Sequence, residues 1–126
     1  MLITLFYSII CESITFENTD TLSQKMVQQQ MKETITEVFI KNIRIIFDIA
    51  FLDCSNIEYV SFQEPCILTE IGMNAFRGCT KLKSISFPSS IQKIYLSAFH
   101  YCSNIEYVSF QEPSNLTTIG ESAFNG

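Results

Sequence analysis

The chain has 126 residues, of which 47% are hydrophobic and 17% are charged; this composition excludes a disordered chain and allows a buried core. The formal net charge is −5 and the 8 Lys and Arg residues are scattered, which argues against nucleic acid as a partner. The 5 cysteines form no C-x-x-C motif and His100 is the only histidine, so we expect neither a metal site nor a cofactor.

Residues 1–13 admit two interpretations. A mostly apolar run from Leu2 to Ile10 precedes Cys11-Glu12-Ser13, as in a signal peptide whose cleavage site follows small residues. The run is too short to span a bilayer. Because no Lys or Arg precedes it, a buried first strand of the fold is the alternative, and both stay open.

Residues 14–49 read as a decayed version of the repeats that follow them. The segment EVFIKNIRIIFDIAF at 37–51 aligns without a gap with ISFPSSIQKIYLSAF at 85–99, which places Phe39 on Phe87. The earlier ITFENTDTL resembles VSFQEPSNL near the end of the chain. Terminal units of a repeat array are atypical because they cap the stack, so we interpret this part as degenerate N-terminal repeats or a cap.

A short helix is expected inside this cap, near residues 21–33. Thr21 and Gln24 have the spacing of a capping box. Apolar residues follow at helical spacing, namely Leu22, Met26, Val27 and Met31.

The segment from residue 50 to residue 126 is an internal repeat. The dipeptide Ala-Phe begins at positions 50, 75, 98 and 123, in steps of 25, 23 and 25 residues. Each unit reads A-F-x-x-C-x-x-[IL]-x-x-[VI]-x-F, then Pro, then two further apolar positions, and CSNIEYVSFQEP occurs twice without a change. The predicted units are 50–74, 75–97, 98–122 and a truncated unit at 123–126.

This pattern predicts a stack of similar coils. Apolar and polar residues alternate in Val60-Ser61-Phe62, as in a strand with one buried face, and Pro65 ends the strand. No unit can enclose its own apolar face, so neighbouring units must bury each other's. The fold class is therefore a repeat solenoid. Because the last unit is incomplete, we also expect a fragment of a longer array, with an apolar end open to end-to-end self-association.

The repeat resembles the BspA-like class of leucine-rich repeat, most clearly in AFRGCTKLKSISFPSSIQKI at 75–94. The resemblance covers 50–126 well, 37–49 loosely and 1–36 hardly at all. It implies a leucine-rich-repeat-like solenoid with a parallel β-sheet on its concave side and short turns or helical pieces on its convex side. It also implies a surface or secreted protein of the adhesion type. One departure is Tyr95, which stands where the family often has Gly.

The residues beside the buried strand positions should project from the concave sheet and form the candidate binding strip. Exposed Tyr is common at binding hot spots, whereas a row of Glu58, Lys83 and Glu106 is equally well explained as a charge ladder between strands. A two-residue insert, Gln-Glu, should bulge from one rim. The candidate partner-binding residues are Tyr59, Ser61, Gln63, Glu64, Ser84, Ser86, Tyr107, Ser109, Gln111 and Glu112.

Nothing in the sequence converges on catalysis. His100 takes a variable position of the repeat, and we expect it to face solvent. Cys54, Cys79 and Cys102 recur with the repeat, which favours a column of buried thiols over nucleophiles.

We therefore expect no enzyme and no small-molecule substrate. The expected function is a protein–protein interaction module on the cell surface or outside the cell, with a host or extracellular-matrix protein as partner. The alternatives are a self-associating segment of a structural array and a cytoplasmic scaffold.

Overall fold

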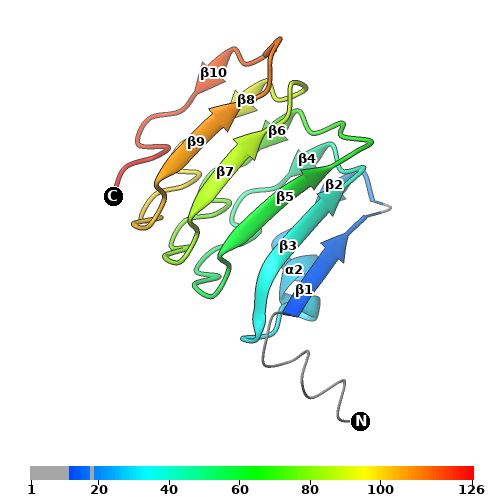
Figure 1. Ribbon diagram of the computed structural model, residues 1–126, viewed down its shortest axis with the longest axis vertical. Helices are drawn as coiled ribbons and strands as arrows, with labels where there is room; N and C mark the ends of the chain where they lie inside the picture. The colour runs from blue at the N-terminus through cyan, green and yellow to red at the C-terminus, as the bar shows by residue number, and fades with distance from the viewer. Residues whose placement is uncertain (1–11, 18) are drawn as a thin grey trace.

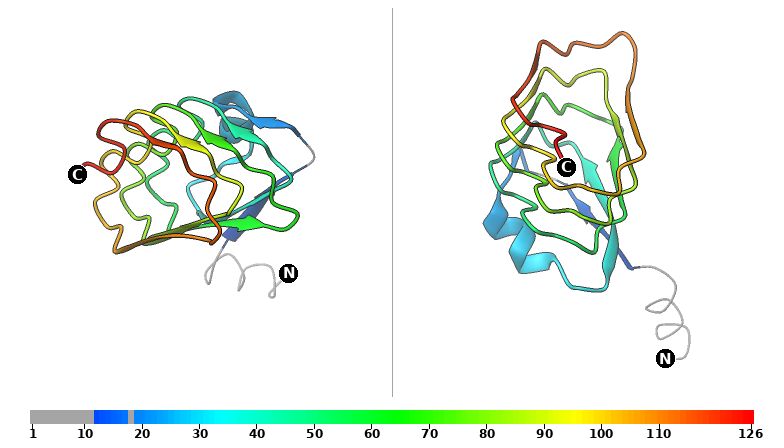
Figure 2. Two further views of the ribbon diagram at one scale, coloured as in Figure 1. Left: turned by 90° about the horizontal axis from the view of Figure 1, so that it is seen from above. Right: turned by 90° about the vertical axis from the view of Figure 1, so that its left-hand side faces the viewer.

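The computed structural model describes residues 12–17 and 19–126, and the apolar run that was interpreted as a signal peptide or first strand lies outside the described residues. The chain winds into coils that stack along one axis (Figures 1 and 2). Every coil contributes one strand to each of two five-stranded sheets, and all strand pairs are parallel. The predicted repeat solenoid is confirmed.

The two sheets differ in the length of their strands. The sheet predicted for the concave side, here called the wide sheet, contains β1 (Glu12–Phe16), β3 (Ile35–Lys41), β5 (Tyr59–Gln63), β7 (Ser84–Phe87) and β9 (Tyr107–Phe110). The opposite side carries a narrow sheet of two-residue strands, where turns and helical pieces were expected. It contains β2 (Thr21–Leu22), β4 (Ile45–Ile46), β6 (Glu70–Ile71), β8 (Lys93–Ile94) and β10 (Thr118–Ile119).

The core is a set of columns in which equivalent residues of successive coils stack. On the narrow sheet the column contains Leu22, Ile46, Ile71 and Ile94, each fully buried. At the Ala-Phe turns the rings of Phe51, Phe76 and Phe99 are parallel, with centroids 4.7 and 5.0 Å apart, and Phe124 continues the stack at 5.2 Å. Burial of these side chains is what holds one coil on the next.

The cysteines of the repeat form a column of their own. The thiol of Cys79 donates a hydrogen bond to the carbonyl oxygen of Phe51 in the preceding coil at 3.3 Å, and Cys102 repeats the contact with Phe76 at 3.0 Å. Both cysteines are buried, whereas Cys54 is only half-buried. They serve as small buried side chains that also satisfy a backbone acceptor.

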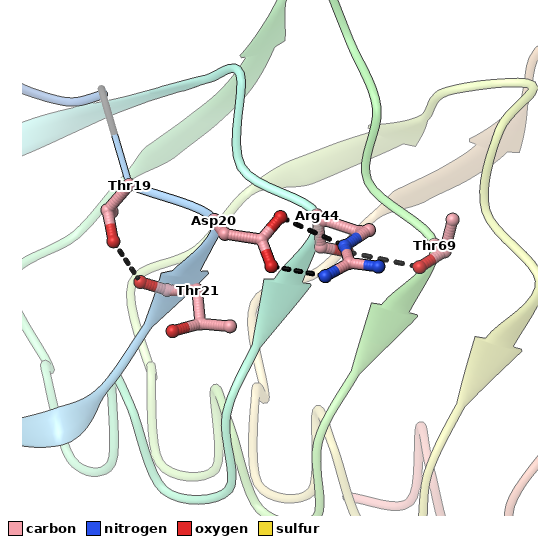
Figure 3. Close-up of polar contacts among 5 residues, drawn as sticks. All are labelled: Thr19, Asp20, Thr21, Arg44 and Thr69. Carbon is pink, nitrogen blue, oxygen red and sulfur yellow. Dashed lines mark hydrogen bonds and ion pairs between the residues drawn. The ribbon is translucent and has the colours of Figure 1, made fainter.

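A polar ladder joins the coils beside the narrow sheet (Figure 3). The guanidinium of Arg44 donates two hydrogen bonds to the carboxylate of Asp20, and this contact lowers the pKa of Asp20. The carbonyl oxygen of Arg44 accepts hydrogen bonds from the backbone N–H of Thr69 at 2.9 Å and from its hydroxyl at 3.2 Å. Thr117 makes the same hydroxyl contact with Gln92 at 3.1 Å, so the ladder recurs two coils later.

The N-terminal helix differs in detail from its prediction. Helix α2 (Gln24–Gln30) lies between β2 and β3. Its N-cap is Ser23, whose hydroxyl accepts from the backbone N–H of Met26 at 3.5 Å. Thr21 cannot be the cap because it already pairs with Ile45 as part of β2.

The gapless alignment of 37–51 with 85–99 is wrong by one residue at its start. Val38 pairs with Val60 and Ile40 with Phe62, so Ile40 holds the buried position that had been given to Phe39. Phe39 pairs with Ser61 and lies on the outward side of β3. Ile46 follows Ile40 by one residue fewer than Ile94 follows the equivalent Phe87, and this difference restores the register at Ile46.

Candidate protein-binding surface

The outward side chains of the wide sheet form two rows that run across the coils. Strand pairing aligns Glu37 with Tyr59, Tyr59 with Ser84 and Ser84 with Tyr107. The second row lies two residues further along each strand and contains Phe39, Ser61, Ser86 and Ser109. We call these eight residues the wide face. It includes the six Tyr and Ser residues predicted from the sequence, together with Glu37 and Phe39, which were missed.

Phe39 and Glu37 help to line a hollow on this face. Its volume is about 260 Å³, and its walls also include Tyr59 and Ser61. The sequence did contain a signal for Phe39. It is two residues from both Glu37 and Lys41, so its side chain lies on the same side of the strand as these two charged residues, which favour contact with solvent. The prediction missed it because the alignment matched Phe39 with Phe87 by residue type and ignored the alternation of charged and apolar residues along the strand.

Tyr59 is fixed in place by charged neighbours. Its side chain is 42% exposed. The Lys83 ammonium lies 3.4 Å from the Tyr59 hydroxyl and 5.1 Å from the ring centroid, and it donates to the Glu58 carboxylate at 2.5 Å. The hydrogen bond from Lys83 lowers the pKa of Glu58. The expected row of acid, base and acid is therefore uneven, because Lys83 pairs with Glu58 and forms no ion pair with Glu106 in the described chain.

Tyr107 has the same sequence around it but a different environment. Its side chain is 72% exposed, and it lies on β9, the edge strand of the wide sheet among the described residues. The base that contacts Tyr59, Lys83, belongs to the coil that follows Tyr59, whereas β9 and β10 belong to the last described coil. The greater exposure of Tyr107 therefore reflects its place at the edge of the described sheet. Glu106 is exposed and forms no ion pair within the described residues.

The glutamates of the two Gln-Glu inserts make hydrogen bonds within their own turns. The Glu64 carboxylate accepts from the backbone N–H of Cys66 at 3.0 Å, and Glu112 accepts from Ser114 at the same distance. The bonds from these glutamates to the following prolines, Pro65 and Pro113, are cis. Gln63 and Gln111 are exposed at the same end of β5 and β9, as are Glu64 and Glu112, so each insert presents an amide beside a carboxylate.

The described residues contain no cluster of three or more His, Cys, Asp or Glu side chains that could hold a metal ion. The expectation of a solvent-facing His100 is only half right: the ring is half-buried, its Nδ1 is buried without a hydrogen-bond partner, and it packs 3.9 Å from the ring of Tyr101. Within the same residues, no helix has both the length and the apolar character required to cross a bilayer.

Comparison with solved structures shows the same fold in larger proteins. The pneumococcal vaccine antigen PcpA is similar with a TM-score of 0.63 and 21% identity, over 72% of this chain and 28% of that one. A leucine-rich repeat protein from Bacteroides ovatus is similar with a TM-score of 0.59 and 18% identity, over 91% of this chain and 34% of that one. The chain therefore spans about a third of these proteins or less.

Sequence comparison gives the family. No curated protein sequence matches the chain. The family described as the BspA type leucine-rich repeat region matches residues 4–70 and 21–126, in 6 copies, and so covers nearly the whole chain. Repeat scaffolds of this kind generally bind partners through their extended surfaces and are not enzymes. The chain belongs to the BspA type leucine-rich repeat family.

Proposed function

We propose that the chain is a non-enzymatic module that binds a protein partner through the wide face, on the surface of a cell or outside it. The observation that carries the proposal is the exposure of Tyr59 and Tyr107 on one face of a rigid sheet. Tyrosine buries a large area at a small cost in side-chain entropy, and it is enriched at binding hot spots.

The spacing of the aromatic residues suits an extended partner. Tyr59 and Tyr107 are two coils apart, or ~10 Å at the usual distance between strands. Phe39 lies one coil before Tyr59 and lines the hollow beside it. Small serines separate these anchors and leave room for a partner's backbone to approach the sheet.

The charges on this side favour a partner with polar or basic groups. Glu37 lies in the hollow and Glu106 has no ion pair in the described chain, whereas Lys83 is already engaged by Glu58. The glutamines Gln63 and Gln111 add amide donors and acceptors at the rim. We propose a host or extracellular-matrix protein as the class of partner, in keeping with a surface location.

The test is a solid-phase binding assay against a panel of purified extracellular-matrix proteins. The double variant Tyr59→Ala/Tyr107→Ala should bind at least tenfold more weakly than the unchanged protein, with an unaltered thermal melt. The matched control is Tyr101→Asn, which removes a tyrosine that is 53% exposed but lies outside the wide face. Equal affinity of the double variant and the control would refute the use of the wide face.

The location can be tested independently of the partner. The intact mass of the protein from its native source distinguishes a mature start near Ile14, which indicates secretion, from a retained Met1, which indicates a cytoplasmic scaffold.

A further inference from the structure

The outer side of the narrow sheet carries a slot that none of the functions considered above uses. Strands β4, β6 and β8 lie side by side there (Figure 1), and one residue follows each strand at the same position of its coil. These residues are Phe47, Gly72 and Tyr95 in successive coils, aligned by the hydrogen bonds from their backbone N–H groups to the preceding strands. Two aromatic side chains thus flank a glycine.

The gap at Gly72 cannot be filled by a side chain. A Cβ added there would lie 2.5 Å from the backbone nitrogen of Asp48 and 2.7 Å from the carbonyl carbon of Phe47. The adjacent coil therefore requires glycine, and the space between the two rings stays open. The cavity at this place has a volume of about 370 Å³ and is lined by Phe47, Gly72, Met73 and Tyr95, among others.

The walls of the slot are apolar and unusually exposed. Phe47 is 46% exposed, Met73 40% and Tyr95 37%. The two rings stand two coils apart, or ~10 Å between their backbones. A flat or extended group that touches both needs ~7–8 Å, which is two carbon contacts of ~3.5–4 Å, so one side chain of a partner fits between them.

The mouth of the slot is acidic. The Glu70 carboxylate accepts a hydrogen bond from the Tyr95 hydroxyl at 3.2 Å, and Asp48 accepts from the backbone N–H of Met73 at 2.7 Å. The ammonium of Lys93 is 4.0 Å from Glu70, at the limit of an ion pair. Arg44 also interacts with Glu70, but its charge is balanced by its ion pair with Asp20. Two carboxylates, Glu70 and Asp48, against the remaining base leave a net negative charge beside the aromatic walls.

We propose that this slot binds the arginine side chain of a partner protein. The guanidinium is planar, stacks on aromatic faces and donates to carboxylates in a fixed fork, while its methylene stem suits the contact with Met73. Charge complementarity selects this occupant over an apolar one, because an apolar side chain would cover the two carboxylates without balancing their charge. Binding here does not depend on the wide face, which lies on the other sheet.

The proposal can be tested by NMR titration of the whole ¹⁵N-labelled chain with Nα-acetyl-arginine methylamide. The backbone signals of Gly72, Met73 and Tyr95 should shift and saturate at millimolar concentration, while those of Tyr59 and Tyr107 stay unchanged. Nα-acetyl-citrulline methylamide, which has nearly the same shape without the charge, should bind at least fivefold more weakly.

Three variants make the test specific to the slot. Glu70→Gln and Tyr95→Ala should each weaken binding at least threefold, and Lys93→Gln should strengthen it because the competing ammonium is removed. All three positions are at least partly exposed, so we expect each variant to fold. The NMR spectrum of each variant checks that the fold is kept. Equal binding of the citrulline probe, shifts spread over the whole surface, or affinity unchanged in Tyr95→Ala would overturn the proposal.

Discussion

Replacing Phe76 by Ala tests whether the phenylalanine stack holds the coils together. The Phe76 ring is fully buried and is parallel to Phe51 at 4.7 Å and to Phe99 at 5.0 Å. Truncation of a buried Phe to Ala costs about 3–5 kcal/mol, and the loss of two stacked neighbours places this site at about 4 kcal/mol. With a urea slope of about 2 kcal/mol per M, the unfolding midpoint should fall by about 2 M.

Two further variants separate stacking from burial. Phe124 is 37% exposed and stacks on one side only, on Phe99 at 5.2 Å, so Phe124→Ala should cost about 1–2 kcal/mol. Phe76→Leu keeps most of the buried volume and should cost about 1–2 kcal/mol. Urea unfolding followed by circular dichroism measures all three. If Phe124→Ala costs as much as Phe76→Ala, the central ring has no special role and the reasoning fails.

Two other predictions concern Cys54 and Gly72. Burial, followed by the charge of Asp53, raises the pKa of Cys54 from 9.0 to about 11, so its alkylation by iodoacetamide should be slow at pH 8 and rise towards pH 11. The folded state holds the thiol proton of Cys54 to higher pH than the unfolded state does, so the contribution of this group to stability falls as the pH rises above 9. Alkylation at the same rate in the folded chain and in urea would contradict the raised pKa. Gly72→Ala should destabilise the chain by about 2–3 kcal/mol in urea unfolding, because the added Cβ meets the backbone of the preceding coil at 2.5 Å. A change under about 0.5 kcal/mol would show that the coils can move apart there.

The turn before each Ala-Phe dipeptide contains a residue in the left-handed region of backbone conformation. The residue types at this position indicate that conformation only in part. The residues before each Ala-Phe have positive φ, from 54° to 56°, namely Ile49, Asn74, Ser97 and Ser122. Asn74 fits this conformation, whereas Ile49 does not, since a β-branched residue is disfavoured there. The turn geometry was therefore not predictable from residue preference. It is imposed by the stacking of the neighbouring coils.

The wide face was predictable only in part. Tyr59 and Tyr107 were identified correctly as outward residues, because alternation along a strand sets the face on which a side chain lies. Phe39 was assigned to the wrong side, because one missing residue in the following connection shifts the alignment without changing the strand. The sequence also did not show that Lys83 pairs with Glu58 rather than with Glu106, since both glutamates lie one coil away from it.

The sequence by itself determined that this is a stack of coils, because a phased apolar repeat can be buried only by its neighbours. The parallel sheet was implied by the resemblance to the family, and the structure confirms it. The sequence also determined that Val60 of the first CSNIEYVSFQEP segment faces the core while Tyr59 and Ser61 face away, because side chains alternate along a strand. Only the tertiary structure decided the register of β3, the existence of the narrow sheet and the slot between Phe47 and Tyr95. A strand of two residues is too short to show an alternation of apolar and polar residues in the sequence. The slot is formed by residues of three different coils, and these meet only when hydrogen bonds between the coils align them.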